Sequence, residues 1–222
     1  MLQSKGLWRV GLVLGLLAGV LHLVGYVLYA HGILNGAIHT NIVSWGLWTF
    51  GSIVAFVTFQ EIAHDWVKSF LNAVCVLGMF VIFGLILYQR GRDHVPFELD
   101  AGMITDLLIA VLDLFVMFIW ILFRKRSLSV IDFWLQVDII ISFLPIMRST
   151  IADPSSETLI PWVLWTFAYL AQYFCIACRA ADKVGDEVDL KSTKRSLNTP
   201  LNYLFWHGAL AFVLLQGGAA LL

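Results

Sequence analysis

Seven long apolar stretches constrain this chain more than any other feature of its sequence. Each has about the length, ~20 residues, that a helix needs to cross the hydrocarbon core of a bilayer. In lipid the backbone must satisfy its own hydrogen bonds, which favours helices. The sequence therefore predicts an all-α integral membrane protein, with the lipid bilayer as its partner and one membrane domain over residues 1–222. The predicted spans are 7–29, 42–60, 68–88, 103–123, 130–148, 159–178 and 200–222.

Composition excludes several other classes of protein. The chain is 60% hydrophobic and 13% charged, about half the charged share of a globular protein, and the short connections leave almost no chain for a soluble domain. A net charge of −1 gives no indication of a nucleic-acid partner. We find no phosphate-binding glycine loop, zinc-protease motif or nucleophile elbow. We therefore expect no enzyme activity, no cofactor and no metal.

The placement of Lys and Arg predicts the orientation of the chain. Most of the 14 basic residues flank one set of span ends, which includes the N-terminus, the cluster 124–126 and the connection 179–195. The opposite ends carry only Arg90, Arg92 and Arg148. Because cytoplasmic loops are enriched in basic residues, we expect the N-terminus in the cytoplasm and the C-terminus outside. This arrangement requires an odd number of spans.

Two short segments of the chain recur in the same order. Residues 44–50 read SWGLWTF and residues 161–167 read PWVLWTF. A weaker echo follows, with LNAVCVLG at 71–78 and LNYLFWHG at 201–208. Such self-similarity indicates a duplicated unit, and membrane carriers are often built from repeats with the site between them.

The recurring segments place the second and third spans in correspondence with the sixth and seventh. We therefore predict a first three-helix repeat over 1–88, a connector helix over 103–123 and a second three-helix repeat over 130–222. A single connector makes both units cross the bilayer in the same direction. The predicted fold is thus two parallel three-helix bundles joined by one helix, a 3-1-3 arrangement.

Four tryptophans in the recurring segments are candidate binding residues. Each pair is three positions apart and so shares a helix face. An indole offers a flat apolar surface and one N–H donor, which suit stacking against a sugar ring or a heterocycle. The alternative is an interfacial belt, because Trp collects where membranes meet water. The four residues are Trp45, Trp48, Trp162 and Trp165.

Asn72 and Asn202 occupy matching places in the second echo. A buried amide must find hydrogen-bond partners. Both amides could hold the hydroxyls of a neutral polar solute in a shared cavity, or each could bond a neighbouring helix.

Four further residues are candidates for gating or coupling. Asp138 lies in the middle of a span, where a carboxylate indicates a functional site, unless it bonds an adjacent helix or His22. Tyr169 continues the face of the second Trp pair, and His207 could border the cavity or be packed. Pro145 frees a backbone carbonyl and can kink its helix.

Two further features concern helix packing. Asp106 and Asp113 of the connector nearly share a face and could contact the bundles. Glycines at 11, 15 and 19 form a ladder that lets helices approach closely. We interpret the ladder as internal packing, with a homo-oligomer contact as the alternative.

Several of these residues resemble the PQ-loop/SWEET superfamily. The resemblance rests on Pro145-Ile146-Met147-Arg148 followed by the Trp162-x-x-Trp165 helix, and on residues 29–48, which are similar to uncharacterised bacterial members. It implies the 3-1-3 fold and a bacterial inner membrane. Members are typically passive carriers of sugars or amino acids, whereas others are sorting receptors or accessory proteins. The nicotinamide riboside carriers share this architecture and a Trp-rich site.

The resemblance also implies roles for particular residues. Sugar carriers of the superfamily hold substrate with paired Asn and aromatic residues, which correspond here to Asn72, Asn202, Trp45 and Trp162. The chain departs from the pattern in its first half, where Leu28 and Ser44 replace the prolines seen at 145 and 161.

We therefore expect a carrier that passes a small neutral polar solute, such as a sugar, nucleoside or amino acid, by alternating access between two bundles. The alternative is a non-transporting receptor or accessory protein of the same fold. The missing prolines favour this alternative, because prolines supply the flexibility that alternating access uses.

Overall fold

The computed structural model describes residues 2–93, 99–123, 128–181 and 187–218. These residues form seven α-helices and one short 3₁₀ helix. The bounds are α1 Leu2–Leu34, α2 Ile42–Ala63, α3 Trp66–Arg92, α4 Ala101–Phe123, α5 Leu128–Ala152, η1 Pro154–Ser156, α6 Leu159–Ala181 and α7 Glu187–Gln216.

The seven helices confirm the all-helical membrane fold, and six of them are long and apolar enough to cross a bilayer. The exception is α7, which begins well before the predicted span because the polar stretch 187–199 continues the same helix. Hydropathy alone could not have found this extension. The basic cluster 124–126 and the last part of the predicted seventh span, 219–222, lie outside the described residues.

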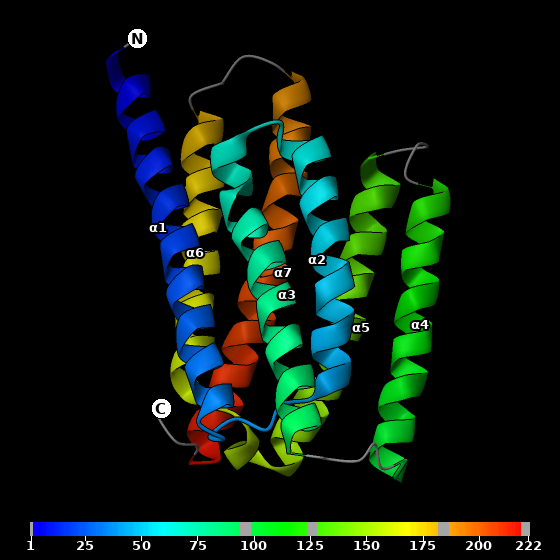
Figure 1. Cartoon of the computed structure of the whole chain (residues 1–222). Helices are drawn as coiled ribbons and strands as arrows, with labels where there is room; N and C mark the ends of the chain where they lie inside the picture. The colour runs from blue at the N-terminus through cyan, green and yellow to red at the C-terminus, as the bar shows by residue number, and fades with distance from the viewer. Residues whose placement is uncertain (1, 94–98, 124–127, 182–186, 219–222) are drawn as a thin grey trace.

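Consecutive helices run in opposite directions along the bundle (Figure 1). The two ends of the chain therefore lie at opposite ends of the molecule, and α2 and α6 run in the same direction. We refer to the two ends of the bundle as the N-terminal end and the C-terminal end. The connections 35–41 and 153–158 both lie at the C-terminal end.

Six of the helices form a closed ring. Neighbouring helices in the ring follow the order α1, α3, α2, α5, α7 and α6, and α6 packs extensively against α1 to complete it. The remaining helix, α4, lies outside the ring against α5 and α2. The largest cluster of buried side chains fills the interior of the ring and is rich in Trp, Tyr and Ile.

The outer surface of the ring and of α4 is apolar. Many large hydrophobic side chains are exposed there, including Leu77, Leu108, Val111 and Phe205. Exposed apolar surface of this extent is typical of a protein that faces lipid. On α4, the buried residues instead form the face that packs against the ring.

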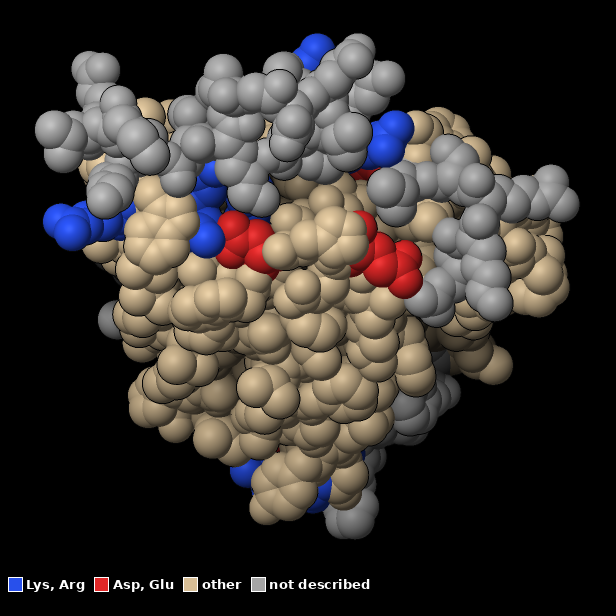
Figure 2. Space-filling model, turned by 90° about the horizontal axis from the view of Figure 1, so that it is seen from above, with Lys and Arg blue, Asp and Glu red and all other residues tan. Residues whose placement is uncertain are grey.

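Charged side chains gather at the N-terminal end, where Figure 2 shows basic and acidic groups close together. Asp65 caps the start of α3 by accepting a hydrogen bond from the backbone N–H of Val67 at 3.0 Å. Its other carboxylate oxygen accepts from Arg179 Nε at 2.6 Å, and the guanidinium of Arg179 stacks over the ring of Trp8. These contacts tie α1, α3 and α6 together.

The glycine ladder of α1 faces the inside of the molecule. A Cβ added at Gly15 would lie 2.6 Å from Val67 Cγ1, and one added at Gly19 would lie 2.3 Å from Phe70 Cε1. At Gly11 the nearest atom would be Arg179 Cγ, at 2.5 Å. The ladder therefore brings α1 close to α3 and α6, which confirms its interpretation as internal packing.

Candidate functional site

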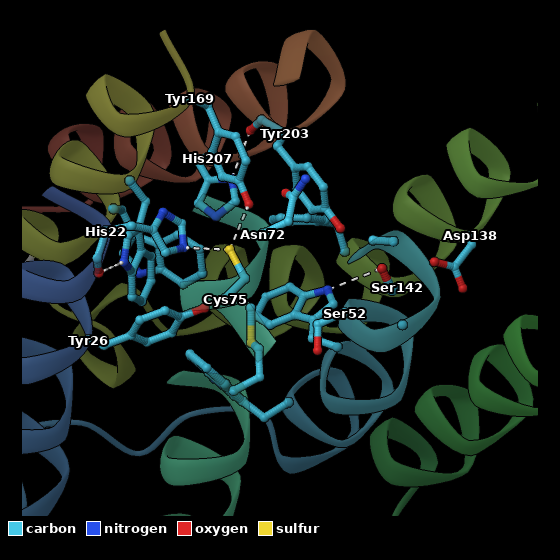
Figure 3. A pocket seen from close by; sticks show the side chains of 18 residues that line it. His22, Tyr26, Ser52, Asn72, Cys75, Asp138, Ser142, Tyr169, Tyr203 and His207 are labelled. Carbon is cyan, nitrogen blue, oxygen red and sulfur yellow. Dashed lines mark hydrogen bonds between the residues drawn. The ribbon is translucent and has the colours of Figure 1, made fainter. Parts of the chain in front are cut away.

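A small cavity lies at the centre of the ring and receives side chains from all six of its helices (Figure 3). Its free space is ≈ 20 Å³, which holds about one water molecule. No described residue of α4 lines it. The lining residues are His22, Tyr26, Trp45, Trp48, Gly51, Ser52, Ala55, Asn72, Cys75, Met79, Asp138, Ser142, Phe143, Trp162, Trp165, Tyr169, Tyr203 and His207.

The four predicted tryptophans meet in this cavity. Ring centroids of Trp45 and Trp165 are 6.1 Å apart, as are those of Trp48 and Trp162. All four side chains are buried, with at most 6% of their surface exposed. The belt interpretation is therefore wrong: these indoles form an aromatic cluster between α2 and α6, away from the lipid.

The indole N–H groups of the two Trp pairs are bonded in a matching way. Trp45 Nε1 donates to Thr40 Oγ1 at 2.9 Å, and Trp162 Nε1 donates to Glu157 Oε2 at 3.1 Å. In both cases the acceptor lies five positions earlier in the chain. Thr49 Oγ1 in α2 donates to the carbonyl of Trp45, and Thr166 Oγ1 in α6 donates to the carbonyl of Trp162, each at 2.7 Å.

The second Trp of each pair bonds across to the other half of the molecule. Trp48 Nε1 donates to Ser142 Oγ of α5, and Trp165 Nε1 donates to the carbonyl of His22 in α1, each at 3.1 Å. All four indole N–H groups thus have partners in the protein. What remains for a ligand is the faces of the rings.

Asn72 and Asn202 lie in different surroundings. Asn72 is 3% exposed, lines the cavity, and its Nδ2 atom has no hydrogen-bond partner. Asn202 does not line the cavity: its Nδ2 atom donates to Oε1 of Gln136 at 2.9 Å and to the carbonyl of the same residue at 3.2 Å. The structure therefore does not bring the two amides together.

Three polar residues that the sequence did not single out as binding residues line the cavity around Asn72. His22 Nε2 lies 3.2 Å from Cys75 Sγ, which in turn lies 3.4 Å from Tyr169 Oη. The other ring nitrogen of His22 has no partner. Tyr203 stacks on Tyr169 with ring centroids 4.7 Å apart. Single polar residues in an apolar span carry no spacing signal, so the sequence could not assign Cys75 or Tyr203 to this site.

Three of the four predicted gating residues line the cavity, and two of them, Tyr169 and His207, lie side by side. Tyr169 takes part in the chain of contacts just described, and His207 lies beside it with ring centroids 5.0 Å apart. His207 Nδ1 lies 2.8 Å from the carbonyl of Tyr203, one turn earlier in α7. His207 is thus both packed and part of the cavity wall.

Asp138 reaches the cavity from α5 and lies on Gly51 of α2, where an added Cβ would meet its Oδ2 atom at 3.3 Å. Its Oδ1 atom has no hydrogen-bond partner, and His22 contacts Cys75 instead. Asp113 of α4 is fully buried, and both of its carboxylate oxygens are also without partners.

Pro145 lies inside α5 and outside the cavity lining. The N–H of the next residue, Ile146, donates to Ser44 Oγ of α2 at 3.0 Å. Ser44 therefore anchors α2 to α5 beside Pro145.

The C-terminal end of the cavity is covered by a buried carboxyl group. Glu157, between η1 and α6, is 1% exposed and accepts hydrogen bonds from Tyr29 and Trp162. Burial raises the pKa of Glu157 to about 7. Nearby, Arg148 forms an ion pair of 2.8 Å with Asp106, which also accepts from Asn41.

Comparisons of the chain with protein families, with curated proteins and with solved structures found no match. Among the described residues, no group of three His, Cys, Asp or Glu side chains could hold a metal ion. The chemistry that the site offers is therefore that of aromatic faces and a few polar atoms without partners.

Proposed function

We propose that this protein is a membrane carrier for a small neutral polar solute. One observation carries the proposal: within a ring of six helices, four indoles surround a central cavity that also receives the amide of Asn72. The Nδ2 atom of Asn72 is a hydrogen-bond donor without a partner, and a buried donor left unsatisfied is costly. A hydroxyl or carbonyl of a solute would satisfy it.

The chemistry of the wall favours a neutral solute that has both a flat and a polar side. Indole faces stack on sugar rings and heterocycles, and Asn72, Ser52 and His22 supply hydrogen-bonding atoms in the cavity wall. No Lys or Arg lines the cavity. An anionic solute would therefore meet no fixed cation to neutralise it.

The proposed mechanism is alternating access between two three-helix units. The ring order places α1, α3 and α2 beside one another, followed by α5, α7 and α6. A half-turn about the ring axis exchanges these two sets in the same order. Together with the matching hydrogen bonds of the Trp pairs, this supports the duplicated 3-1-3 arrangement. It also supports the family resemblance, which we retain as part of the proposal.

In this conformation the cavity has room for only about one water molecule. The proposal therefore requires the two units to separate, so that the indoles move apart and admit the solute. Trp48 and Trp162, which meet edge to face in the cavity wall, would have to part. Asn202 would join the site only after releasing Gln136.

A counterflow screen in proteoliposomes tests the proposal. Vesicles loaded with unlabelled sugars, nucleosides or amino acids should take up the matching labelled solute in at least one case. Asn72→Ala should reduce that uptake more than tenfold, whereas Asn198→Ala, which removes an amide bonded to Asp132 outside the cavity, should not. Absence of uptake for every solute would contradict the carrier function.

The alternative function is a non-transporting receptor or accessory protein, and the small volume of the cavity favours it. The aromatic rings nearly fill the centre, as a packed core would. This alternative predicts that Cys75, which lines the cavity, never reacts with a water-soluble thiol reagent in the folded protein. It further predicts no counterflow.

We propose that the N-terminal end faces the cytoplasm and that the membrane is a bacterial inner membrane. The orientation is supported by the distribution of Lys and Arg along the chain. The choice of membrane rests on the family resemblance. A reporter enzyme active only outside the cytoplasm should be active when fused to the C-terminus and inactive when fused to the N-terminus.

A further inference from the structure

Glu157 is a buried acidic residue to which the proposed carrier function assigns no role. It lies in the short connection between η1 and α6, yet only 1% of its surface is exposed. Tyr29 Oη of α1 lies 2.8 Å from one carboxylate oxygen and 2.9 Å from the other. Trp162 Nε1 donates to the second oxygen at 3.1 Å. The carboxyl group therefore joins α1 to α6.

The same group of contacts extends to α2. Trp45 Nε1 donates to Tyr29 Oη at 3.2 Å and to Thr40 Oγ1 at 2.9 Å. We call Tyr29, Thr40, Trp45, Glu157 and Trp162 the end latch. Its side chains come from α1, the connection 35–41, α2, the connection 153–158 and the start of α6, so both proposed three-helix units contribute to it. A backbone bond of 3.0 Å from His39 N to Ser156 O joins the two connections beside the latch.

The end latch separates the central cavity from a cleft at the C-terminal end. Trp45 and Trp162 are members of the latch and also line the cavity. On the other side, Thr40 lines a cleft of ≈ 220 Å³, together with His39 and Gln89. A solute that passes from this cleft to the cavity would have to cross the latch.

The charged and titratable groups around Glu157 are few. Tyr29 is the titratable side chain that contacts it from α1. His39 on the connection 35–41 and Arg90 and Asp93 at the end of α3 line the adjacent cleft. Two further groups at this end have partners of their own: Asp153, which caps η1, and Asp106, which is paired with Arg148. Among the described residues, no cation is hydrogen-bonded to Glu157.

We propose that Glu157 is a proton-binding group that controls the end latch, so that the latch is closed while Glu157 is protonated and opens when the proton leaves. This inference rests on the proposed carrier function and makes the carrier proton-linked. A buried carboxylate without a cation is unfavourable, and separation of α1 from α6 would expose it to water. Because burial raises its pKa to about 7, the change falls within the physiological range of pH.

The native thiol of Cys75 can report the opening, because Cys75 lines the cavity behind the latch. The test uses the full chain in lipid nanodiscs with Cys175→Ala and Cys178→Ala, and a small water-soluble thiol reagent. The labelling rate is divided by that of the same protein carrying Glu157→Gln at the same pH. The ratio removes the effect of thiol ionisation on the rate, because both proteins carry the same thiol. We expect this ratio to rise at least threefold from pH 6 to pH 8. A ratio that stays constant over this range would overturn the proposal.

Two further variants keep the test independent of the folding of one protein. Glu157→Asp retains a titratable group and should retain the pH dependence. Tyr29→Phe removes the hydroxyl from the latch and should increase labelling at pH 6 at least threefold over the unmodified latch. If Tyr29→Phe increases the labelling of Cys75 neither at pH 6 nor at pH 8, the proposed role of the latch is contradicted. Cys75→Ser gives the background.

The two proposals fail in different ways. Counterflow together with a labelling ratio that does not depend on pH would overturn the latch and leave the carrier. Labelling that depends on Glu157, without counterflow of any solute, would overturn the carrier function and leave a proton-controlled opening of the cavity.

Discussion

Asn72 is buried with an amide nitrogen that has no partner, which is a source of instability in the closed protein. Leaving such a donor unsatisfied costs about 1–3 kcal/mol. We therefore expect Asn72→Leu to raise the melting temperature of the purified protein, measured by thermal unfolding in detergent. The same variant should lose solute uptake, because the donor is the group that would bind the solute.

Asn202→Leu provides the matched control for this prediction. Its amide is bonded to Gln136, so its removal should lower the melting temperature and leave the acceptors of Gln136 without a donor. The two substitutions replace the same residue type and should shift stability in opposite directions. Destabilisation of similar size by both would contradict the difference between the two sites.

Glu157 should make stability depend on pH. Its pKa is about 7 in the folded protein, against 4.5 for an ordinary Glu. Between these values the folded protein keeps a proton that the unfolded chain has lost, so stability is highest below pH 4.5 and falls as the pH rises through 7. The loss is about 3 kcal/mol.

The measurement that checks this expectation is thermal unfolding between pH 5 and pH 8. The melting temperature of the wild-type protein should fall relative to that of Glu157→Gln over this range. Parallel curves for the two proteins would show that Glu157 has an ordinary pKa.

Among the helices, α1 depends on glycine for its close approach to α3. A methyl group at Gly15 would meet Val67 Cγ1 at 2.6 Å and the Val67 carbonyl at 3.0 Å, and overpacking of this kind costs about 1–3 kcal/mol. Gly15→Ala should therefore lower the melting temperature. Gly84→Ala in α3, where nothing lies within 4 Å, should leave it unchanged or raise it slightly, since Ala is the better helix former.

The helix α4 presents a second test, because Asp113 is fully buried and both of its carboxylate oxygens lack hydrogen-bond partners. A buried carboxyl group whose oxygens make no hydrogen bonds is unfavourable. Asp113→Asn should therefore leave the melting temperature unchanged or raise it. A lower melting temperature would indicate that the Asp113 carboxyl group has a stabilising role.

The sequence predicted the helices well where hydropathy defines them. The predicted spans 42–60 and 103–123 lie within α2, Ile42–Ala63, and α4, Ala101–Phe123. The predicted seventh span begins at residue 200, whereas α7 begins at Glu187. The difference arises because a polar helical extension carries no hydropathy signal. The helices α2 and α3 begin directly after Asn41 and Asp65, whose side chains cap them. A search for apolar windows does not detect such caps.

The candidate site was only partly predictable for a similar reason. Recurrence of Trp-x-x-Trp identified both halves of the aromatic cluster, because it fixes two residues on one helix face. The paired Asn residues shared a sequence echo, but an echo does not fix how each helix is rotated. Asn72 consequently lines the cavity while Asn202 bonds Gln136.

The molecule as a whole is a ring of six helices closed by the contact of α1 with α6, with α4 outside it. Its centre is nearly filled by aromatic side chains in the closed conformation. A carrier built in this way must open the ring toward each end in turn, because a single path through the centre would be a channel. The two ends differ: the C-terminal end carries the end latch, and the N-terminal end carries the ion pair of Asp65 and Arg179.

The most direct test of a carrier is whether Cys75 can be reached from both sides of the membrane. The protein with Cys175→Ala and Cys178→Ala is reconstituted in sealed vesicles of known orientation, and an impermeant thiol reagent is added to one side at a time. Alternating access predicts labelling of Cys75 from either side. Labelling from the C-terminal side should also increase from pH 6 to pH 8 relative to that of the same protein carrying Glu157→Gln. Labelling from one side only, or from neither, would contradict the proposed carrier.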